Sequence, residues 1–181
     1  MLLVERENEL GLQKLRHIIN DQYRSKATLR YYRIGNFFYR HNMKALAYVM
    51  QWIGMRRTGN DIASSAAIDK SVHFPHPIGI VIGSGVKIEK NVIIHANVII
   101  GGKPVGGKLK YPIIRGGGII YGNSCLLGNI VLHKNSVIGA GSVVLNSTHE
   151  GKVYAGCPAK EIVKRRECII KKREMINEKR L

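Results

Sequence analysis

The chain has 181 residues, of which 45% are hydrophobic and 23% are charged, enough for one buried core with a small helical appendage. It has no run of 18 apolar residues and is charged by its fifth residue, so neither a membrane-spanning helix nor a signal peptide is expected and a cytoplasmic location is predicted. The three cysteines, Cys125, Cys157 and Cys168, form no CxxC motif, which argues against a disulfide framework or a cysteine zinc site.

The formal net charge of +17 is divided over the chain, with +7 in residues 1–60, +5 in residues 61–159 and +5 in residues 160–181. Such a spread suits a polyanionic small-molecule donor, an anionic acceptor, a negatively charged membrane face or nucleic acid about equally. No nucleic-acid-binding motif accompanies the charge, so nucleic acid is not an expected partner and a basic nucleic-acid-binding module is only an alternative.

Residues 1–60 are predicted to form an N-terminal helical segment, with Asn42 as a candidate N-cap for its last helix. The basic aromatic stretch Arg30–His41 has two explanations, contact with a membrane surface or packing against a neighbouring subunit or the β domain, and we favour packing. Apolar residues recur here at helical intervals, at Leu12, Leu15, Ile18, Ile19, Leu46, Val49, Met50 and Ile53.

A six-residue repeat begins after Asp61 and continues to Val144. Neither a helix nor an alternating sheet calls for this period, whereas a triangular coil with one hexad per flat side does. An ordinary β-sandwich would need loops of varied length, so it is the less favoured alternative. The aliphatic residues expected to point into the coil are Ile82, Ile88, Ile94, Ile100, Ile114, Ile120, Leu126, Leu132, Ile138 and Val144; Gly83, Gly101, Gly122, Asn123, Gly128 and Gly139 are expected near corners.

The repeat is broken twice, and both breaks are candidate sites. Phe74 and Ile82 are eight residues apart, and Ile100 and Ile114 are fourteen apart. The second break, rich in Gly and Lys, predicts a loop over residues 102–112, and such loops on a rigid scaffold commonly carry function. After residue 159 the basic tail, residues 160–181, is predicted to be helical and to cap the coil.

Three runs, GIVIGSGVKIEKNVIIHANVIIGG, GNIVLHKNSVIGAGSVVLNS and AGCPAK, resemble the serine acetyltransferases of the hexapeptide-repeat acyltransferase superfamily. The resemblance covers residues 60 to about 163. It implies a mainly β protein, a left-handed parallel β-helix over residues 61–159. It further implies a homotrimer with active sites between subunits, acetyl-CoA as cosubstrate, and no metal. Further pairing of trimers is an open alternative, against which the short helical head argues.

By this resemblance the catalytic residues are His76 and Asp61. The family's histidine segment reads PHPIGIVIG here, and its aspartate segment reads NDI fifteen residues earlier. A neutral imidazole can take the proton of a hydroxyl that attacks a thioester, and a carboxylate fixes the imidazole tautomer. The alternatives are that His76 is only a corner residue between prolines, and that His73, His95 and His133 are metal ligands; surface roles are favoured for the latter three.

The acceptor side departs from the family. Pro75 replaces the aspartate that grips the serine amino group, and Lys110, Tyr111 and Pro112 replace the loop's Arg-His-Pro. Losing such partners disfavours serine, so Tyr111, Lys110 and Pro75 are candidate residues for binding another acceptor. The helical head is also much shorter than that of the family's enzymes, as in relatives that O-acetylate sugars near the membrane.

The donor side is predicted to be retained, with small residues lining a groove for acetyl-CoA at Gly102, Gly122, Ala140, Ala155, Gly156 and Pro158 and with Lys160 near the CoA phosphates. The leading hypothesis is acetylation of a sugar hydroxyl of a capsular, O-antigen or exopolysaccharide, with a carbohydrate acceptor and a peripheral contact with the inner membrane face. Serine O-acetyltransferase is the alternative, and a non-catalytic trimeric scaffold is an alternative of another class.

Overall fold

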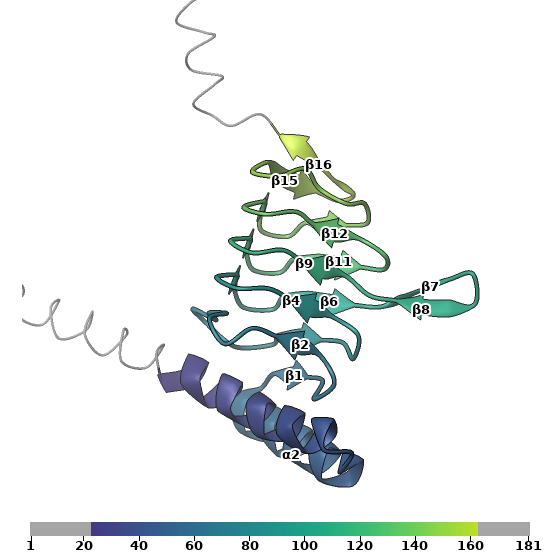
Figure 1. Cartoon of the computed structure of the whole chain (residues 1–181). Coiled ribbons are helices and arrows are strands. Elements are labelled where there is room, and N and C mark those ends of the chain that lie inside the picture. Colours follow the sequence, from purple (N-terminus) through teal and green to yellow (C-terminus); the bar gives the residue numbers. More distant parts are fainter. Residues whose placement is uncertain (1–22, 163–181) are drawn as a thin grey trace, which may run out of the picture.

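The computed structural model describes residues 23–162. Two helices, residues 23–40 and α2 (Lys44–Thr58), lie at the base of a three-sided coil of short strands, and a two-stranded hairpin projects from the coil's side (Figure 1). The predicted helical head is therefore confirmed for these residues, whereas its stretch Leu12–Ile19 lies outside the described residues.

Three sheets form the sides of the coil, and successive strands visit them in turn. Sheet A consists of β1 (Asp61–Ile62), β3 (Val81–Ile82), β6 (Ile99–Gly101), β11 (Cys125–Leu127) and β14 (Val143–Val144). Sheet B consists of β2 (Ala67–Ile68), β4 (Lys87–Ile88), β9 (Ile113–Ile114) and β12 (Val131–Leu132). Sheet C consists of β5 (Ile93–Ile94), β10 (Ile119–Ile120), β13 (Val137–Ile138), β15 (Val153–Gly156) and β16 (Ala159–Ile162).

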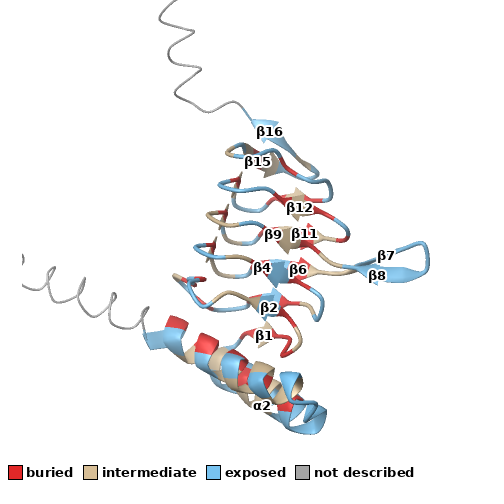
Figure 2. Cartoon of the chain, viewed as in Figure 1, coloured by how far each residue is buried: buried red, intermediate tan, exposed pale blue. Residues whose placement is uncertain are grey.

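The predicted inward residues stack in the interior. All strand pairs of the three sheets are parallel except β15 with β16, and the register sets Ile82 against Ile100 and Ile100 against Leu126. All ten predicted positions are buried, which forms the red interior of Figure 2. Because each aliphatic residue lies above its counterpart one turn earlier, the hexad repeat produces a continuous apolar core.

Left-handed backbone lets the chain turn at the corner between sheets C and A. Asn97 (φ 56°), Asn123 (φ 60°) and Gly141 (φ 68°) adopt it between sheets C and A. Only Asn and Gly take this conformation at low cost. Of the predicted corner residues, Asn123 and Gly128 have positive φ, whereas Gly83, Gly101, Gly122 and Gly139 do not.

The second break forms an antiparallel hairpin, β7 (Lys103–Val105) with β8 (Lys108–Lys110), as the predicted loop requires. Gly106 and Gly107 supply its turn with φ values of 57° and 75°. Every residue of both strands is exposed. The two strands of the hairpin are therefore not part of the core of this chain.

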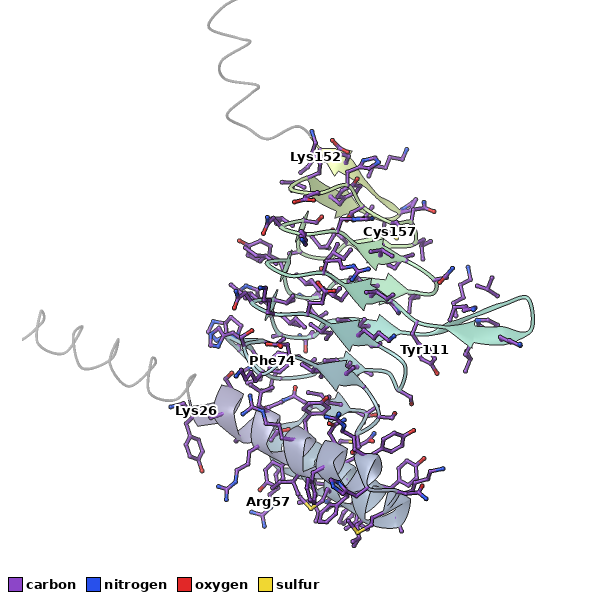
Figure 3. The ribbon with its side chains drawn as sticks, in the orientation of Figure 1. Lys26, Arg57, Phe74, Tyr111, Lys152 and Cys157 are labelled. Atoms are coloured by element: carbon purple, nitrogen blue, oxygen red, sulfur yellow. The ribbon has the colours of Figure 1, made fainter. Side chains whose placement is uncertain are left out.

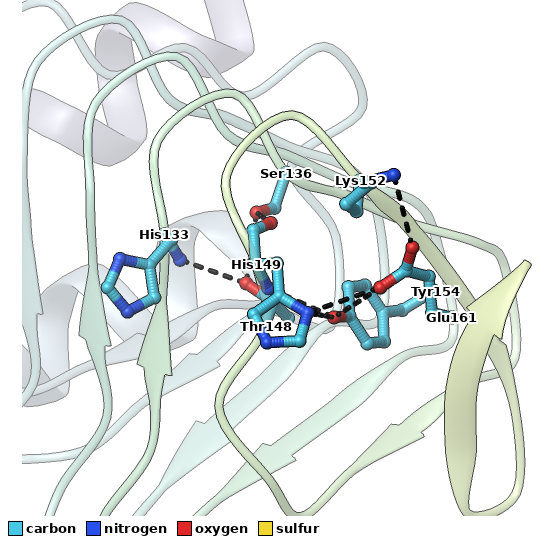
Figure 4. A network of polar contacts seen from close by, with 7 residues as sticks. All are labelled: His133, Ser136, Thr148, His149, Lys152, Tyr154 and Glu161. Carbon is cyan, nitrogen blue, oxygen red and sulfur yellow. Dashed lines mark hydrogen bonds and ion pairs between the residues drawn. The ribbon is translucent and has the colours of Figure 1, made fainter.

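A polar network closes the C-terminal end of the coil (Figure 4). Tyr154 is buried, and its hydroxyl accepts a hydrogen bond from the backbone N–H of His149 (2.9 Å) and lies 3.2 Å from Glu161 Oε2. Contact with His149 is the main reason that the Glu161 pKa is lowered. The predicted helix is not seen at its start, because residues 159–162 pair with β15 as a strand; residues 163–181 lie outside the described residues.

The basic aromatic stretch packs against the coil, the explanation that the sequence favoured. The buried Tyr32 donates a hydrogen bond to the carbonyl of Ala66 (2.7 Å), and Asn36 donates one to the carbonyl of Ser64 (2.8 Å). Phe37 alone among the tyrosines and phenylalanines of this stretch is exposed.

The apolar residues that predicted α2 do not form its buried face. Ala47 and Gly54 are buried, whereas Leu46 and Val49 are 47% and 51% exposed. Small residues are selected here because a Cβ on Gly54 would lie 3.0 Å from the Tyr31 Cβ. The predicted N-cap was also wrong: the cap is Met43, and Asn42 adopts a left-handed conformation in the preceding turn.

Candidate functional site

His76 occupies an exposed turn at the first break in the repeat, between the half-buried Pro75 and the buried Pro77. The turn connects sheet C with sheet A, because His73 forms a bridge with Ile93 of β5 before it and β3 follows it. Proline fixes its own φ and restricts the residue before it, so the backbone around His76 has few conformations available.

The segment that carries Asp61 is hydrogen-bonded to the segment that follows His76. The Asp61 N–H donates to the carbonyl of Ile80 (2.9 Å). The buried Asn60 donates from Nδ2 to the carbonyl of Pro77 (2.9 Å) and accepts at Oδ1 from the Ile80 N–H (3.0 Å). The segment that bears Asp61 and the segment that bears His76 therefore lie side by side.

Helix α2 orients the Asp61 carboxylate. Gln51 donates from Nε2 to Asp61 Oδ1 (2.8 Å), and its Oε1 accepts from the N–H of Ser64 (3.1 Å). The amide is thus fixed at both ends, and it holds one oxygen of the Asp61 carboxylate in place. Gln51 is a positioning residue that the sequence analysis missed, because only the approach of α2 to β1 reveals it.

Tyr111 lies at another edge of the coil. A Cβ on Gly85 would meet the Tyr111 ring at 2.3 Å, and one on Gly102 would meet it at 2.7 Å. These glycines flank the passage from sheet A to sheet B, whereas His76 lies between sheets C and A; Figure 3 labels Tyr111 at the base of the hairpin. Within one chain, therefore, Tyr111 and the exposed Lys110 do not lie beside His76.

Gly102 lies beneath the Tyr111 ring, at the passage from sheet A to sheet B rather than at the edge where His76 lies. Its lack of a side chain is explained by Tyr111, because a Cβ there would displace the aromatic ring.

The other predicted donor-site residues share the edge where His76 lies. Gly122 and Ala140 follow β10 and β13 at the passage from sheet C to sheet A, and the Gly141 N–H donates to the carbonyl of Gly122 (3.0 Å). Ala155 lies one turn further, where a Cβ on Gly139 would approach its methyl group to 3.0 Å. A column of small residues therefore runs along this edge away from His76.

Buried serines make this edge rigid. Ser124 Oγ donates to the carbonyl of Tyr121 (2.6 Å) and lies 3.0 Å from that of Gly139, which also accepts from Ser142 Oγ (2.6 Å). The column ends at the exposed residues Gly156 and Pro158 and at Lys160 of β16, which pairs with Ala155. The Cys157–Pro158 peptide is cis.

His95 and Tyr121 flank the candidate site, although neither was predicted to take part. Their rings stack with centroids 4.9 Å apart at an interplanar angle of 22°. The pKa of His95 is lowered, first by burial and then by the positive charge that His76 and His73 can carry. The hexad register could have revealed the pair, because His95 and Tyr121 both follow the inward residue of a sheet C hexad.

Two clefts lie near the helices. One of about 880 Å³ opens against sheet B and includes Arg40, Lys87 and Arg115 but neither His76 nor Asp61. Another of about 540 Å³ reaches the His76 turn at Pro77 and Ile78. Within residues 23–162 no group of three or more His, Cys, Asp or Glu side chains is arranged to hold a metal ion, and no helix there is long and apolar enough to cross a membrane.

No protein-family model matches the chain. Among curated proteins, the serine acetyltransferase of Escherichia coli K12 is 35% identical over 136 residues, 75% of this chain and 50% of the relative. That of Bacillus pumilus is 30% identical over 132 residues, 73% of this chain and 61% of the relative. The chain thus spans about half the length of most of the curated relatives it matches.

Solved structures agree in fold. A serine acetyltransferase in complex with CoA superposes with a TM-score of 0.70 at 36% identity, covering 75% of this chain and 56% of that one. The soybean serine acetyltransferase complexed with serine gives 0.71 at 30% identity, covering 75% and 56%. These neighbours supply the hand of the coil, which sequence alone does not fix. The chain is serine acetyltransferase-like, with the left-handed β-helix fold of the hexapeptide-repeat acetyltransferases.

Proposed function

We propose that this protein is an acetyl-CoA-dependent O-acetyltransferase that uses His76 as general base. The observation that carries the proposal is the hydrogen-bonded pairing of the Asp61 segment with the His76 turn, with Gln51 holding the carboxylate. The likeness to serine acetyltransferases, one of them in complex with CoA, supports the donor.

The chemistry needs no group beyond those named. Acetyl-CoA supplies a thioester whose carbonyl carbon is attacked by the acceptor oxygen. His76 accepts the hydroxyl proton as the new C–O bond forms, and it returns a proton to the thiolate as the C–S bond breaks. Asp61 orients the imidazole and stabilises its protonated form.

The donor is assigned to the edge that carries His76. The small residues Gly122, Ala140 and Ala155 leave room beside the backbone, and Lys160 at the far end is a cation for a CoA phosphate. Because Tyr111 and Lys110 lie at another edge, they join this site only if a second chain supplies them. A homotrimer with sites between subunits meets that requirement, and further pairing of trimers is the less favoured alternative.

Two acceptors are candidates, and different observations favour them. Serine is favoured by the comparisons, since the matched relatives are serine acetyltransferases. A sugar hydroxyl is favoured by Pro75 and Tyr111, because neither offers a charge to the amino or carboxylate group of serine.

Contact with an anionic membrane face belongs to the same proposal, and its support lies on α2. Tyr48, Val49 and Trp52 of this helix are all more than half exposed, and Arg56 lies over the Trp52 ring at 5.1 Å. The helix has no acidic residue. Exposed aromatic and aliphatic side chains with basic neighbours suit the surface of an anionic bilayer.

A screen of acceptors tests the function. We expect release of free CoA thiol from acetyl-CoA only when an acceptor hydroxyl is present. Serine and a panel of methyl pyranosides and bacterial polysaccharides are supplied in parallel. Turnover with either class supports O-acetyl transfer and identifies the acceptor, and no turnover with any of them overturns the proposal.

A further inference from the structure

The cleft of about 540 Å³ is lined by both helices and by the turn that carries His76. The first helix contributes Arg24 and Thr28, and the last turn of α2 contributes Arg57 (Figure 3). The turn contributes Pro77, the residue after His76. A concave site of this volume, with a few polar groups that converge on it, is typical of a binding site for a small molecule.

The cleft adjoins the candidate dyad on its helical side. Gly59, which lines the cleft, comes two residues before Asp61, and its carbonyl accepts a hydrogen bond from the Gly79 N–H (3.0 Å). The column of small residues assigned to the donor runs from the His76 turn in the opposite direction, toward β15. A ligand in the cleft and acetyl-CoA on the column would therefore approach His76 from different sides.

A single buried amide fixes three parts of the cleft wall. Asn60 Nδ2 lies 2.9 Å from the carbonyl oxygen of Pro77, 3.1 Å from that of Thr58 and 3.1 Å from Thr28 Oγ1. Thr58 is held a second time, because its hydroxyl donates to the carbonyl of Gly54 (2.8 Å). The first helix, the end of α2 and the His76 turn are thus joined before any ligand binds, which lowers the entropy cost of binding.

The cleft is positively charged. Arg24 and Arg57 are exposed, neither forms an ion pair within residues 23–162, and none of the described residues that line the cleft is acidic. Helix position alone does not bring an arginine here, since Arg56 of the same turn lies over the Trp52 ring instead, at 5.1 Å. Two guanidinium groups without acidic neighbours favour an anion, and they offer no partner to an ammonium group.

We infer that this cleft binds the phosphate group of a phosphorylated sugar, and that a hydroxyl of the same sugar is the acceptor that reaches His76. The inference rests on the proposed O-acetyltransferase function. A phosphate monoester carries about −1.5 to −2 charges at pH 7 on three terminal oxygens, so it suits two arginines, whereas a carboxylate needs only one. The phosphate stays intact, and the acetyl group moves to the sugar hydroxyl. Serine fits less well, because its ammonium group would meet the positive charge of Arg24 and Arg57.

A binding test uses the full chain and two double variants. Arg24→Gln/Arg57→Gln removes both charges of the cleft, and Arg30→Gln/Lys44→Gln removes one exposed cation from each of the same two helices outside it. Calorimetry without acetyl-CoA measures binding of the 1-phosphates of glucose, galactose and N-acetylglucosamine. We expect the Kd to rise about tenfold or more in the cleft variant and less than about twofold in the control. Equal changes in both variants, or no binding of any of the three to the wild type, would overturn the inference.

Kinetics separate the inference from the function on which it rests. The acceptor KM of the wild type should be about tenfold lower for a pyranose 1-phosphate than for the methyl pyranoside of the same sugar, and Arg24→Gln/Arg57→Gln should abolish this advantage. A rise in the KM for acetyl-CoA instead would assign the two arginines to CoA, and an equal advantage for a methyl glucuronide would assign them to carboxylates; either result overturns the inference. Turnover of serine or of methyl pyranosides with no gain from phosphate overturns the inference alone, whereas no turnover of any acceptor overturns both.

Discussion

Asn60 ties the two halves of the candidate dyad together through its side chain, donating to the carbonyl of Pro77 at 2.9 Å. The same amide accepts from the Ile80 N–H at 3.0 Å and lies 3.1 Å from Thr28 Oγ1 of the first helix. Its side chain is 3% exposed, so water does not replace these bonds. Asn60 therefore positions the His76 turn from inside the protein.

Replacing this amide should impair both stability and catalysis. Asn60→Ala leaves buried backbone groups without partners, so we expect the free energy of unfolding to fall by about 2 kcal/mol. We also expect kcat to fall more than the KM for acetyl-CoA rises, because the base loses its position. Denaturant unfolding and initial rates measure these effects. Asn91→Gly, at an exposed corner with φ 58°, is the control, and equal stability of both variants would contradict the assigned role.

The pKa of His95 reports whether its imidazole interacts with that of His76. The folded-state pKa of His95 is lowered from 6.5, so on acidification the unfolded chain binds this proton first and stability falls as the pH drops below about 6.5. His76→Ala removes one cause and should raise the His95 midpoint, whereas His133→Ala should not. NMR titration of the imidazole protons measures both, and an unchanged midpoint in His76→Ala would show that the two rings do not interact.

The close approach of Gly85 to the Tyr111 ring predicts that mutations at these two positions are energetically coupled. A Cβ at Gly85 would lie 2.3 Å from the ring, so Gly85→Ala should cost about 1–3 kcal/mol of unfolding free energy. The same change in a Tyr111→Ala background should cost much less. A double-mutant cycle by chemical denaturation checks this. Equal losses of unfolding free energy in the two backgrounds would mean that the Tyr111 ring does not pack on Gly85.

Membrane contact through α2 predicts a dependence on Trp52 and on lipid charge. Vesicles rich in phosphatidylglycerol should retain the protein in a flotation assay, vesicles of phosphatidylcholine should not, and Trp52→Ser should weaken retention severalfold. Leu109→Ser removes an equally exposed apolar residue from the hairpin and should have no effect. Retention that ignores lipid charge, or that survives Trp52→Ser, would remove the membrane from the proposal.

The coil was predictable because its rule is local. Each hexad places one aliphatic residue inward, so the inward positions from Ile82 to Val144 follow from the repeat alone. The fourteen-residue gap correctly indicated a loop outside the coil, but not that this loop is a hairpin. The helical periodicity of α2 was also informative, but periodicity does not say which face is buried. The buried face consists instead of Ala47 and Gly54, the small residues at which the helix approaches the rest of the protein.

The site was less predictable because its contacts join distant residues. The resemblance to serine acetyltransferases predicted the dyad of Asp61 and His76, but Gln51, which orients the carboxylate, comes from a separate helix. The stacking of His95 on Tyr121 was missed, although the register of β5 with β10 follows from the hexad repeat, because no single motif marks the pair. For Gly102, the sequence indicated the need for a small residue but not that Tyr111 creates that need.

The most direct test of the central claim is release of CoA thiol from acetyl-CoA by His76→Ala, beside the wild type and Asp61→Asn, with the acceptor that the screen identifies. His76 is exposed, so its truncation should leave thermal unfolding nearly unchanged. We predict a loss of kcat of about 100-fold or more for His76→Ala and a smaller loss for Asp61→Asn. Undiminished turnover by folded His76→Ala would contradict the assignment of His76 as the general base.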